Sequence, residues 1–390
     1  MFKLAKRLQS LPPYLFLEID KAKRAARAQG RDIIDLGIGD PDQPTPKHII
    51  EALYKAACDP SNHRYALDQG MPVLRNTIAS WYKNRFGARL DPETEILPLI
   101  GSKEGIAHLP MAFLDTGDYS LIPDPCYPPY KGGTILAGGK PYLMGLEESN
   151  SFLPDFKKIP AATLKKSKLL YINYPNNPTS AVAGQDFYNQ TIKFAKKNKL
   201  IVASDLAYSE MAYDGYQPKS MLELPEAKDV TIEFHSLSKT YNMTGWRIGW
   251  ACGNAKLISA LAKVKSNIDS GIFSALQLAA VAALETPQEF IKEMCELYQQ
   301  RRDVLAKGLK SLGWGITAPK ATFYFWIKIP GKKKISSIDF AKILLEKCDI
   351  VATPGVGFGK YGEGFIRMAL TVPAERIKEA MERIKKQIAA

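Results

Sequence analysis

Short apolar runs of strand-like composition alternate with helical stretches along most of the chain, for example the helical stretch 184–198. The strand-like runs are residues 95–100, 119–122, 168–173, 200–205, 230–235 and 248–252. Apolar runs of this length, bounded by polar and turn-forming residues, are typical of buried strands. Because strand–helix alternation is the pattern of parallel strands joined by crossover helices, the sequence predicts an α/β fold with a large, mostly parallel sheet covered by helices.

The last hundred residues follow a different pattern. A long helical stretch over 287–312 precedes a strand-like run at 323–327, a helical stretch at 337–347 and a second strand-like run at 365–370. We expect a smaller α+β domain here, completed by the N-terminal segment. A chain of 390 residues is long enough for two hydrophobic cores. The predicted division is a large domain over 46–284 and a small domain formed by 1–45 and 285–390.

Charge and cysteine content argue against several classes of protein. Lysine and arginine (53) exceed aspartate and glutamate (40), giving a formal net charge of +13. The basic residues are scattered and no aromatic residues interleave with them, so the pattern indicates no nucleic-acid partner. Five cysteines, an odd number, lie far apart without a CxxC pair, which indicates neither a disulfide framework nor a zinc site. We therefore expect no metal.

The apolar segments are too short or too interrupted to cross or target a membrane. The longest, near 272–284, contains Ser274 and Gln277 and is shorter than a bilayer requires. Pro12 and Pro13 interrupt the apolar stretch that a signal peptide would need. The sequence predicts a cytoplasmic protein without a membrane partner.

Polar side chains follow four of the strand-like runs, at 101–103, 173–177, Asp205 and 236–239. In open parallel sheets, ligands collect at the carboxyl ends of the strands. These four segments should therefore converge on one crevice.

Lys239 lies just past a strand-like run, among small hydroxylic residues that include Ser236, and Arg247 follows it. An amine nucleophile beside hydroxyl and guanidinium groups can serve one phosphate-bearing ligand. The alternative interpretation is a Ser- and Thr-rich turn with a solvated lysine. The segment alone does not distinguish the two.

Asp205 ends an apolar strand, where a carboxylate is costly unless it meets a cation or hydrogen-bond donors. A protonated pyridine nitrogen is such a cation, and Tyr208 could then bond the phenolic oxygen of the same ring. The alternative is an aspartate that caps a helix. The turn at 174–180 presents Asn177, which is either an ordinary turn residue or an amide offered to that oxygen.

In this order, Asn-Pro-Thr at 177–179, Asp-x-Ala-Tyr at 205–208, Ser-x-Ser-Lys at 236–239 and an arginine eight residues on resemble the class I/II aminotransferases of fold type I. Each element is weak alone, but the ordered set is specific, and the likeness covers essentially the whole chain. It implies the fold of the pyridoxal-phosphate-dependent transferases and pyridoxal 5'-phosphate as cofactor.

The resemblance implies a role for each matching residue. Lys239 matches the Schiff-base lysine, which with Asp205 and Tyr208 makes up the catalytic set. Asp205 matches the partner of the pyridine nitrogen, and Asn177 and Tyr208 match the pair on the phenolic oxygen. The remaining cofactor residues are Ser102 and Lys103 at a helix N-terminus, Tyr127 stacked on the ring, and Ser236 and Arg247 at the phosphate. Ser180 departs from the glycine that the family usually has after Asn-Pro-Thr.

Further matches concern the substrate and assembly. Arg367 matches the arginine that forks onto the substrate α-carboxylate, although alone it could be an ordinary strand-edge residue. Gly39 lies in a glycine-rich turn that lets the backbone approach the substrate, and Tyr127 and Asn177 also border the substrate. Tyr65 lies in a segment similar to one that sends a tyrosine into the partner subunit's phosphate site. The resemblance thus implies a homodimer with active sites at the subunit interface.

Segments 99–108, 233–247 and 265–271 most resemble the LL-diaminopimelate aminotransferases. This implies reversible amino transfer between LL-2,6-diaminopimelate and 2-oxoglutarate, giving tetrahydrodipicolinate and glutamate in lysine biosynthesis. Lys103, Asp68 and Asn267 are candidates for the far end of the substrate, the last two from the partner subunit. The family often has glutamate near the position of Asp68. The alternatives are an aminotransferase for aspartate, alanine or aromatic amino acids, and a pyridoxal-phosphate-dependent β-lyase.

Overall fold

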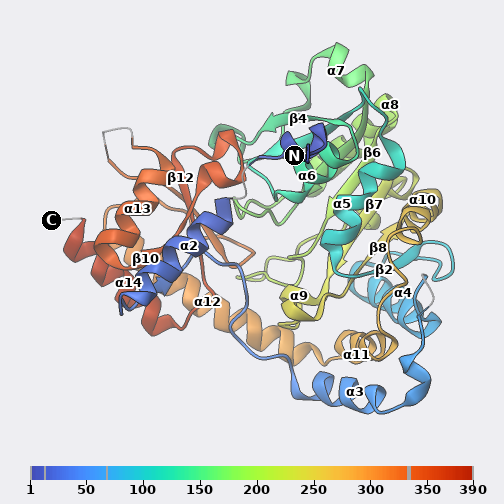
Figure 1. Cartoon of the computed structure of the whole chain (residues 1–390), viewed down its shortest axis with the longest axis horizontal. Coiled ribbons are helices and arrows are strands. Elements are labelled where there is room, and N and C mark those ends of the chain that lie inside the picture. Colours follow the sequence, from blue (N-terminus) through green and yellow to red (C-terminus); the bar gives the residue numbers. More distant parts are fainter. Residues whose placement is uncertain (1, 13–14, 67–68, 332–334, 389–390) are drawn as a thin grey trace.

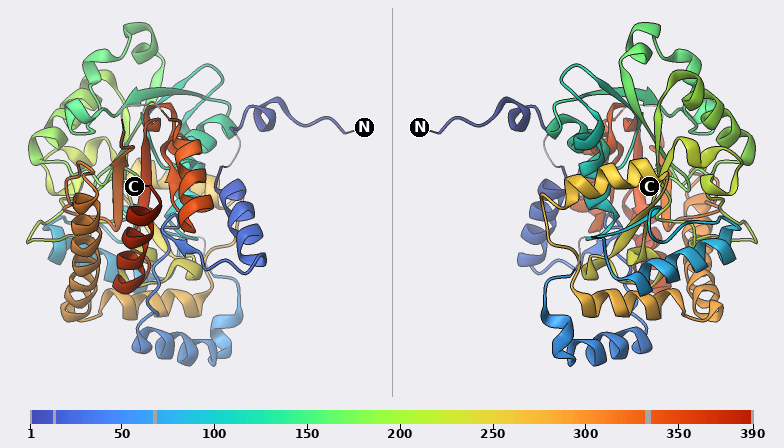
Figure 2. Two further views of the ribbon diagram at one scale, coloured as in Figure 1. Left: turned by 90° about the vertical axis from the view of Figure 1, so that its left-hand side faces the viewer. Right: turned by 90° about the vertical axis from the view of Figure 1, so that its right-hand side faces the viewer.

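The computed structural model describes residues 2–12, 15–66, 69–331 and 335–388. Figure 1 shows two bodies, a larger one built on a wide sheet and a smaller one formed by the two ends of the chain. The long helix α12 (Gln288–Ser311) runs from the larger body to the smaller one. Figure 2 shows the first residues, around α1 (Lys6–Gln9), extending away from both bodies.

The larger body contains a seven-stranded sheet with the order β2-β8-β7-β6-β5-β3-β4. Strand β8 is antiparallel to both of its neighbours, and every other pair is parallel. The sheet is therefore mostly parallel, as predicted. Its strands are β2 (Ile96–Leu99), β3 (Tyr119–Asp124), β4 (Lys140–Gly145), β5 (Ser167–Asn173), β6 (Ile201–Asp205), β7 (Thr231–Ser236) and β8 (Gly249–Gly253).

Strand β4 was not predicted, and its sequence explains why. It reads Lys-Pro-Tyr-Leu-Met-Gly and is only partly buried, so it lacks the continuous apolar run of the inner strands. It forms an edge of the sheet, where one side of the strand has no neighbour and a proline is tolerated. Pro141 therefore removes no hydrogen bond from the interior of the sheet. The six strand-like runs predicted from the sequence all form strands of this sheet.

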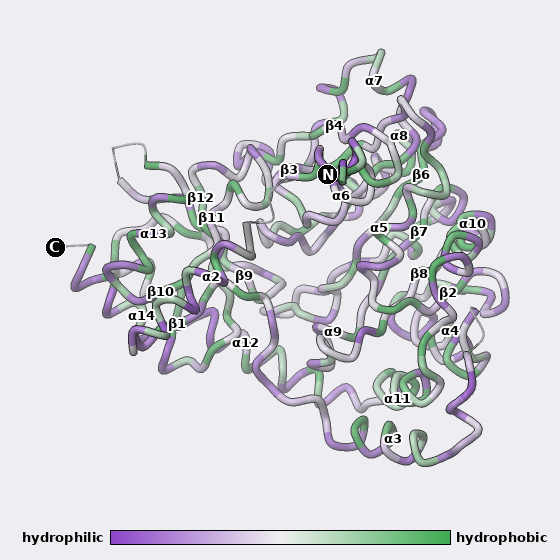
Figure 3. The backbone as a smooth tube through the Cα atoms, in the orientation of Figure 1, coloured by the Kyte–Doolittle hydropathy of each residue, from purple (hydrophilic) through white to green (hydrophobic). Residues whose placement is uncertain are grey.

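Helices cover both faces of the sheet and bury its apolar side chains. One cluster joins Leu99 and Phe234 to Ile106 and Leu261 from the covering helices α5 and α10. A second joins other strand residues to α8, and a third lies around α4 and α11. Hydrophobic and hydrophilic stretches alternate along the backbone in Figure 3, as such amphipathic elements require. The helices are α3 (Lys47–Ala57), α4 (Pro72–Phe86), α5 (Ser102–Phe113), α6 (Pro129–Leu136), α7 (Ala161–Lys165), α8 (Gln185–Asn198), α9 (Leu237–Thr240), α10 (Ala255–Lys265) and α11 (Ser274–Leu284).

The smaller body contains two small sheets. One is antiparallel with the order β11-β12-β9, and in the other β1 pairs with β10 in parallel. The N-terminal segment contributes β1 and the helix α2 (Leu15–Ala28). Other elements are β1 (Ile34–Asp35), β9 (Tyr324–Lys328), α13 (Ser337–Cys348), β10 (Ile350–Val351), β11 (Thr353–Pro354), β12 (Phe365–Ala369) and α14 (Ala374–Gln387).

Helix α12 packs into two different cores. Ile291, near its start, lies in the apolar cluster around α4 and α11, whereas Leu305 and Leu309 lie in the cluster of the smaller body. One continuous helix thus joins the two bodies. The domain boundary predicted at 284/285 stays a prediction. None of the helices formed by the described residues combines the length and apolar character that a bilayer crossing requires.

The second half of α12 should be a main source of stability for the smaller body. Leu305 is fully buried there. Leu305→Ala is expected to lower the free energy of unfolding by about 2–5 kcal/mol, because it removes buried apolar area and leaves a cavity. Urea unfolding measures this change. Lys307→Ala, on the exposed side of the same helix, is the matched control and should change the value by less than about 0.5 kcal/mol.

Candidate active site

A cavity of about 230 Å³ lies where the carboxyl ends of the sheet strands face the smaller body. Asn173, Asp205 and Ser236 are the last residues of β5, β6 and β7, and all three line it. The four polar segments predicted to converge therefore do meet at one place. Eleven of the site residues proposed from the sequence line this cavity: Gly39, Ser102, Lys103, Tyr127, Asn177, Asp205, Tyr208, Ser236, Lys239, Arg247 and Arg367.

One end of the cavity is built to receive an anion. Gly101 has a φ of 74° and precedes the first turn of α5, so the free N–H groups of that turn, beginning at Ser102, face the cavity. A Cβ on Gly101 would collide with the Arg247 guanidinium, and one on Gly249 would lie 2.9 Å from the Ser102 nitrogen. Because neither glycine has a side chain, Arg247, the Ser236 hydroxyl and the N-terminus of α5 can lie close together.

Asp205 presents a buried carboxylate to the cavity. Its side chain accepts hydrogen bonds from the Tyr130 hydroxyl (2.7 Å) and the Ala207 N–H (3.3 Å), and the residue is 6% exposed. Burial raises the pKa of this carboxyl to about 6, against the opposing effect of the two hydrogen bonds. No described lysine, arginine or histidine forms an ion pair with it. A cationic ligand group at this position would relieve that cost.

Lys239 lies in the short helix α9, directly after β7, and places its amine in the same cavity. Its Nζ donates a hydrogen bond to the Gly39 carbonyl oxygen (2.7 Å). Burial lowers the pKa of this amine to about 8; Asp40 opposes that shift, while Arg367 and Arg247 add to it. The lysine can therefore act as a nucleophile or a base near neutral pH far more readily than a solvated one.

Arg367 is held between two aromatic rings on the side of the smaller body. Its guanidinium carbon lies 4.0 Å from the centre of the Tyr324 ring and 4.6 Å from that of Phe358. Its Nη atoms donate to the Asn177 Oδ1 and the Gly37 carbonyl oxygen, each at 2.8 Å. Its Nε is buried without a partner among the described residues. A planar, buried guanidinium with an unused donor suits a carboxylate ligand.

The aromatic hydroxyls of Tyr208 and Tyr324 lie 3.0 Å apart at the wall of the cavity. Because the Asn177 oxygen is engaged by Arg367, the amide nitrogen of Asn177 remains as its donor toward the cavity. Asn177 and Tyr208 therefore both present polar groups to the cavity.

Two of the predicted site residues, Tyr65 and Asn267, do not line the cavity. Tyr65 is 91% exposed, and Asn267 is exposed and bonds the Lys263 carbonyl within its own helix end. Asp68 lies outside the described residues. Tyr65 and Asn267 were expected to act across a subunit interface, so their role there stays a prediction.

Sequence reasoning missed residues that shape the site, among them Tyr130, Tyr324 and Phe358. Tyr130 bonds Asp205, and Tyr324 bonds Tyr208 and supports Arg367. Tyr130 is the second residue of α6, and its ring meets that of Tyr127, which precedes the helix, edge to face at 5.8 Å. Its place three residues after a predicted site residue is a signal that could have been used. Tyr324 stands in an aromatic strand sequence, where nothing separates a site residue from a core residue.

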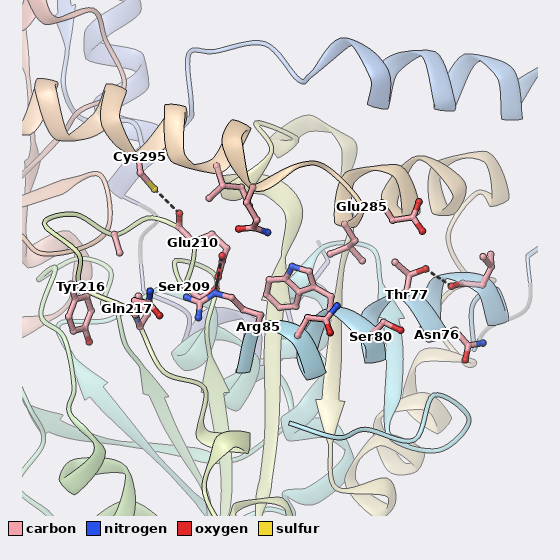
Figure 4. Close-up of a pocket in the computed structure, with 18 residues that line it drawn as sticks. Asn76, Thr77, Ser80, Arg85, Ser209, Glu210, Tyr216, Gln217, Glu285 and Cys295 are labelled. Atoms are coloured by element: carbon pink, nitrogen blue, oxygen red, sulfur yellow. Dashed lines mark hydrogen bonds and ion pairs between the residues drawn. The ribbon is translucent and has the colours of Figure 1, made fainter. Parts of the chain in front are cut away.

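A larger cavity of about 970 Å³ lies elsewhere, between α4, the segment 209–218 and the junction of α11 with α12 (Figure 4). The Nε of Arg85 bonds both carboxylate oxygens of Glu210 there, at 3.0 and 3.1 Å. This charged pair is therefore largely neutralised. The smaller cavity, by contrast, gathers a buried amine, a buried carboxylate and a helix N-terminus, which makes it the candidate active site.

The comparisons with known proteins agree with this geometry. The family model for aminotransferase class I and II matches residues 31–384. A protein named LL-diaminopimelate aminotransferase from Desulforudis audaxviator is 54% identical over 384 residues, covering 98% of this chain and 97% of its own. One of the same name from Moorella thermoacetica is 52% identical over 382 residues, with the same two coverages.

Solved structures are similar over the same length. The substrate-bound structure of BacF from Bacillus subtilis has a TM-score of 0.95 and 39% identity, covering 99% of this chain and 98% of its own. Since the family model spans nearly the whole chain and these identities extend over it, the chain belongs to the class I and II aminotransferases.

Proposed function

We propose that this aminotransferase uses pyridoxal 5'-phosphate to transfer an amino group reversibly between LL-2,6-diaminopimelate and 2-oxoglutarate, giving tetrahydrodipicolinate and glutamate in lysine biosynthesis. The observation that carries the chemistry is the meeting of Lys239, Asp205 and Arg367 in one cavity. The substrate is supported by relatives named LL-diaminopimelate aminotransferase that are 52–54% identical over nearly the whole chain.

The residues of the cavity fit this cofactor at both of its ends. The N–H groups at Ser102, with Ser236 and Arg247, suit its phosphate, and the first turn of α5 adds Lys103. Asp205 suits the protonated ring nitrogen, since its buried carboxylate has no cation of its own. Asn177 and Tyr208 would hold the phenolic oxygen. Tyr127, also in the cavity wall, would stack on the ring.

When bound, pyridoxal phosphate supplies an aldehyde that exchanges for an amino group and a ring that withdraws electrons from the substrate Cα. Lys239 would hold the resting cofactor through its amine and, once displaced, would remove and return the proton at the substrate Cα. Asp205 would keep the ring nitrogen protonated. Arg367 would orient the α-carboxylate, and Gly39 would let the backbone lie close to the substrate.

Assembly as a homodimer would complete the site. Tyr65 would reach the partner subunit's phosphate site, and Asn267 and Asp68 would meet the far end of the substrate there. Large apolar side chains support such a contact because they are exposed on this single chain: Phe2, Leu4, Tyr65, Ile268 and Phe273. A biosynthetic role on small amino acids and 2-oxo acids is consistent with a cytoplasmic location.

The substrate assignment is tested by an amino-donor panel. With 2-oxoglutarate as acceptor, kcat/KM for LL-diaminopimelate should exceed that for aspartate, alanine and phenylalanine by at least about 10²-fold, because only a substrate with a second amino-acid head uses the distal polar groups. Glutamate formation measures the rate. A higher kcat/KM for aspartate or phenylalanine would contradict the proposed substrate and assign that amino acid instead. Pyruvate release from cystathionine without an acceptor would point to a β-lyase.

The pKa of Lys239 predicts how the apoenzyme takes up its cofactor. Only the unprotonated amine attacks the aldehyde, and its fraction grows as the pH rises through about 8. Below pH 8 the rate of attachment should rise about tenfold per pH unit and then level off. Stopped-flow absorbance of apoenzyme mixed with pyridoxal phosphate measures it. A rate that still rises tenfold per unit near pH 10 would contradict the lowered pKa, and Lys239→Ala should give no lysine-linked absorption.

Asp205→Asn removes the charge opposite the ring nitrogen while keeping the size of the side chain. Loss of one partner from a buried ion pair costs roughly 3–5 kcal/mol, so cofactor affinity or kcat should fall by about 10²-fold or more. Fluorescence titration of apoenzyme and steady-state kinetics separate the two effects. Asp186→Asn, exposed on α8, is the control and should match the unmodified enzyme. Near-normal values for Asp205→Asn would remove this carboxylate from the cofactor site.

A further inference from the structure

We propose that Ser180 is a positioning residue that fixes Tyr324, and through it the carboxylate site at Arg367. Ser180 belongs to the turn of the larger body that also presents Asn177, whereas Tyr324 begins β9 of the smaller body. The inference rests on the proposed function, because it takes the cavity as the site of amino transfer. It concerns a residue that departs from the glycine usual in the family.

Ser180, Thr322 and Tyr324 form a closed cycle of hydrogen bonds. The Ser180 Oγ donates to the Tyr324 carbonyl oxygen at 2.7 Å and lies 2.8 Å from the Thr322 Oγ1. Because Ser180 has one hydroxyl hydrogen and uses it on the carbonyl, Thr322 is the donor in the second contact. The Thr322 Oγ1 in turn accepts the Tyr324 N–H at 3.1 Å. Both backbone groups of Tyr324 are thus tied to the Ser180 hydroxyl.

Two residues of the cycle have unusual backbone conformations. Ser180 has a φ of 58° and Thr322 a φ of 66°, in the left-handed region that residues other than glycine seldom adopt and β-branched residues least of all. Both are buried, at 8% and 0% exposed. Such conformations persist where the surrounding structure determines them, and they gather at functional sites. The hydroxyl contact between these two residues is one such determinant.

The cycle fixes a side chain that shapes the substrate end of the cavity. The Tyr324 hydroxyl lies 3.0 Å from that of Tyr208, and the Tyr324 ring lies 4.0 Å from the Arg367 guanidinium carbon. A Cβ on Gly39 would collide with the Tyr324 hydroxyl, so this ring also limits the space beside the Gly39 backbone. A small displacement of Tyr324 would therefore move the surface on which Arg367 rests.

Other contacts besides the cycle hold the same strand start. The Thr322 N–H donates to the Met211 carbonyl oxygen at 2.8 Å, and the Tyr213 hydroxyl donates to the Thr322 carbonyl oxygen at 2.6 Å. Loss of the Ser180 hydroxyl should therefore loosen Tyr324 without detaching β9. This expected result distinguishes a positioning role of Ser180 from a purely structural one.

Two variants remove the Ser180 hydroxyl but differ in their effect on backbone strain. Ser180→Gly relieves the positive φ, whereas Ser180→Ala keeps it. If the hydroxyl positions Tyr324, both variants should raise KM for the amino donor by about three- to tenfold while kcat changes less than about twofold, because a ground-state carboxylate contact is weakened. The donor used is whichever of the panel the unmodified holoenzyme turns over fastest. Ser180→Gly should nevertheless unfold at a higher temperature than Ser180→Ala.

Ser120→Ala is the matched control. Ser120 is a fully buried serine whose Oγ lies 3.0 Å from the Thr134 Oγ1 inside the larger body, and it does not line the cavity. It should lose some stability but keep the KM of the unmodified enzyme. Hydrogen–deuterium exchange of the holoenzyme gives a readout besides activity. Amides of the segment 322–325 should exchange faster in both Ser180 variants and not in Ser120→Ala.

Thr322→Val tests the cycle itself. It removes the central hydroxyl, so it should reproduce the KM increase, and the Ser180→Ala/Thr322→Val double variant should be no worse than either single variant. Additive effects would overturn the cycle. An unchanged KM and unchanged exchange in Ser180→Ala, or a KM increase in Ser180→Ala but not in Ser180→Gly, would overturn the role of the hydroxyl. Inactivity of the unmodified enzyme toward every donor would overturn the proposed function instead, while the exchange result would still decide the role of Ser180.

Discussion

The carboxylate of Asp205 is the constraint on which the rest of the site depends. It stands at the end of β6, in the middle of a sheet whose interior is apolar, and burial raises its pKa to about 6. Two neutral donors, Tyr130 and the Ala207 N–H, only partly offset the loss of water. A carboxylate held here without a cation among the described residues suits a ligand that brings one, such as the ring nitrogen of the cofactor proposed above.

Much of this site was predictable because it follows from chain direction. In a parallel sheet the residues that follow successive strands share one edge, so Asn177, Asp205 and Lys239 could be grouped from the sequence alone. The same rule does not reach the smaller body. Arg367 was found only through its place in a family pattern, and Tyr324 was not found, because an aromatic residue in a strand is a core residue unless its neighbours in space are known.

The edge strand and the interface residues mark two further limits of sequence reasoning. β4 is half-buried and contains Pro141, so its pattern is too weak to indicate a strand before its neighbour is known. Tyr65 and Asn267 are exposed on a single chain, and a role for them depends on a second copy. In both cases the deciding information is a neighbour distant in sequence or on another molecule, which no local pattern contains.

The same burial moves the two central titratable groups in opposite directions. It raises the pKa of Asp205 to about 6 and lowers that of Lys239 to about 8, because burial disfavours the charged form of each group. The cavity wall also contains Lys103, Arg247 and Arg367, so its cations outnumber its one carboxylate. A ligand with a doubly charged phosphate and a protonated ring nitrogen, together with a substrate that bears a carboxylate, would pair with each of these charged groups. The charges of the cavity wall are therefore matched to those of the proposed cofactor and substrate. The positions of Ser180 and Tyr324 matter because the Tyr324 ring, with hydrogen bonds to Asn177 and the Gly37 carbonyl oxygen, fixes the guanidinium of Arg367.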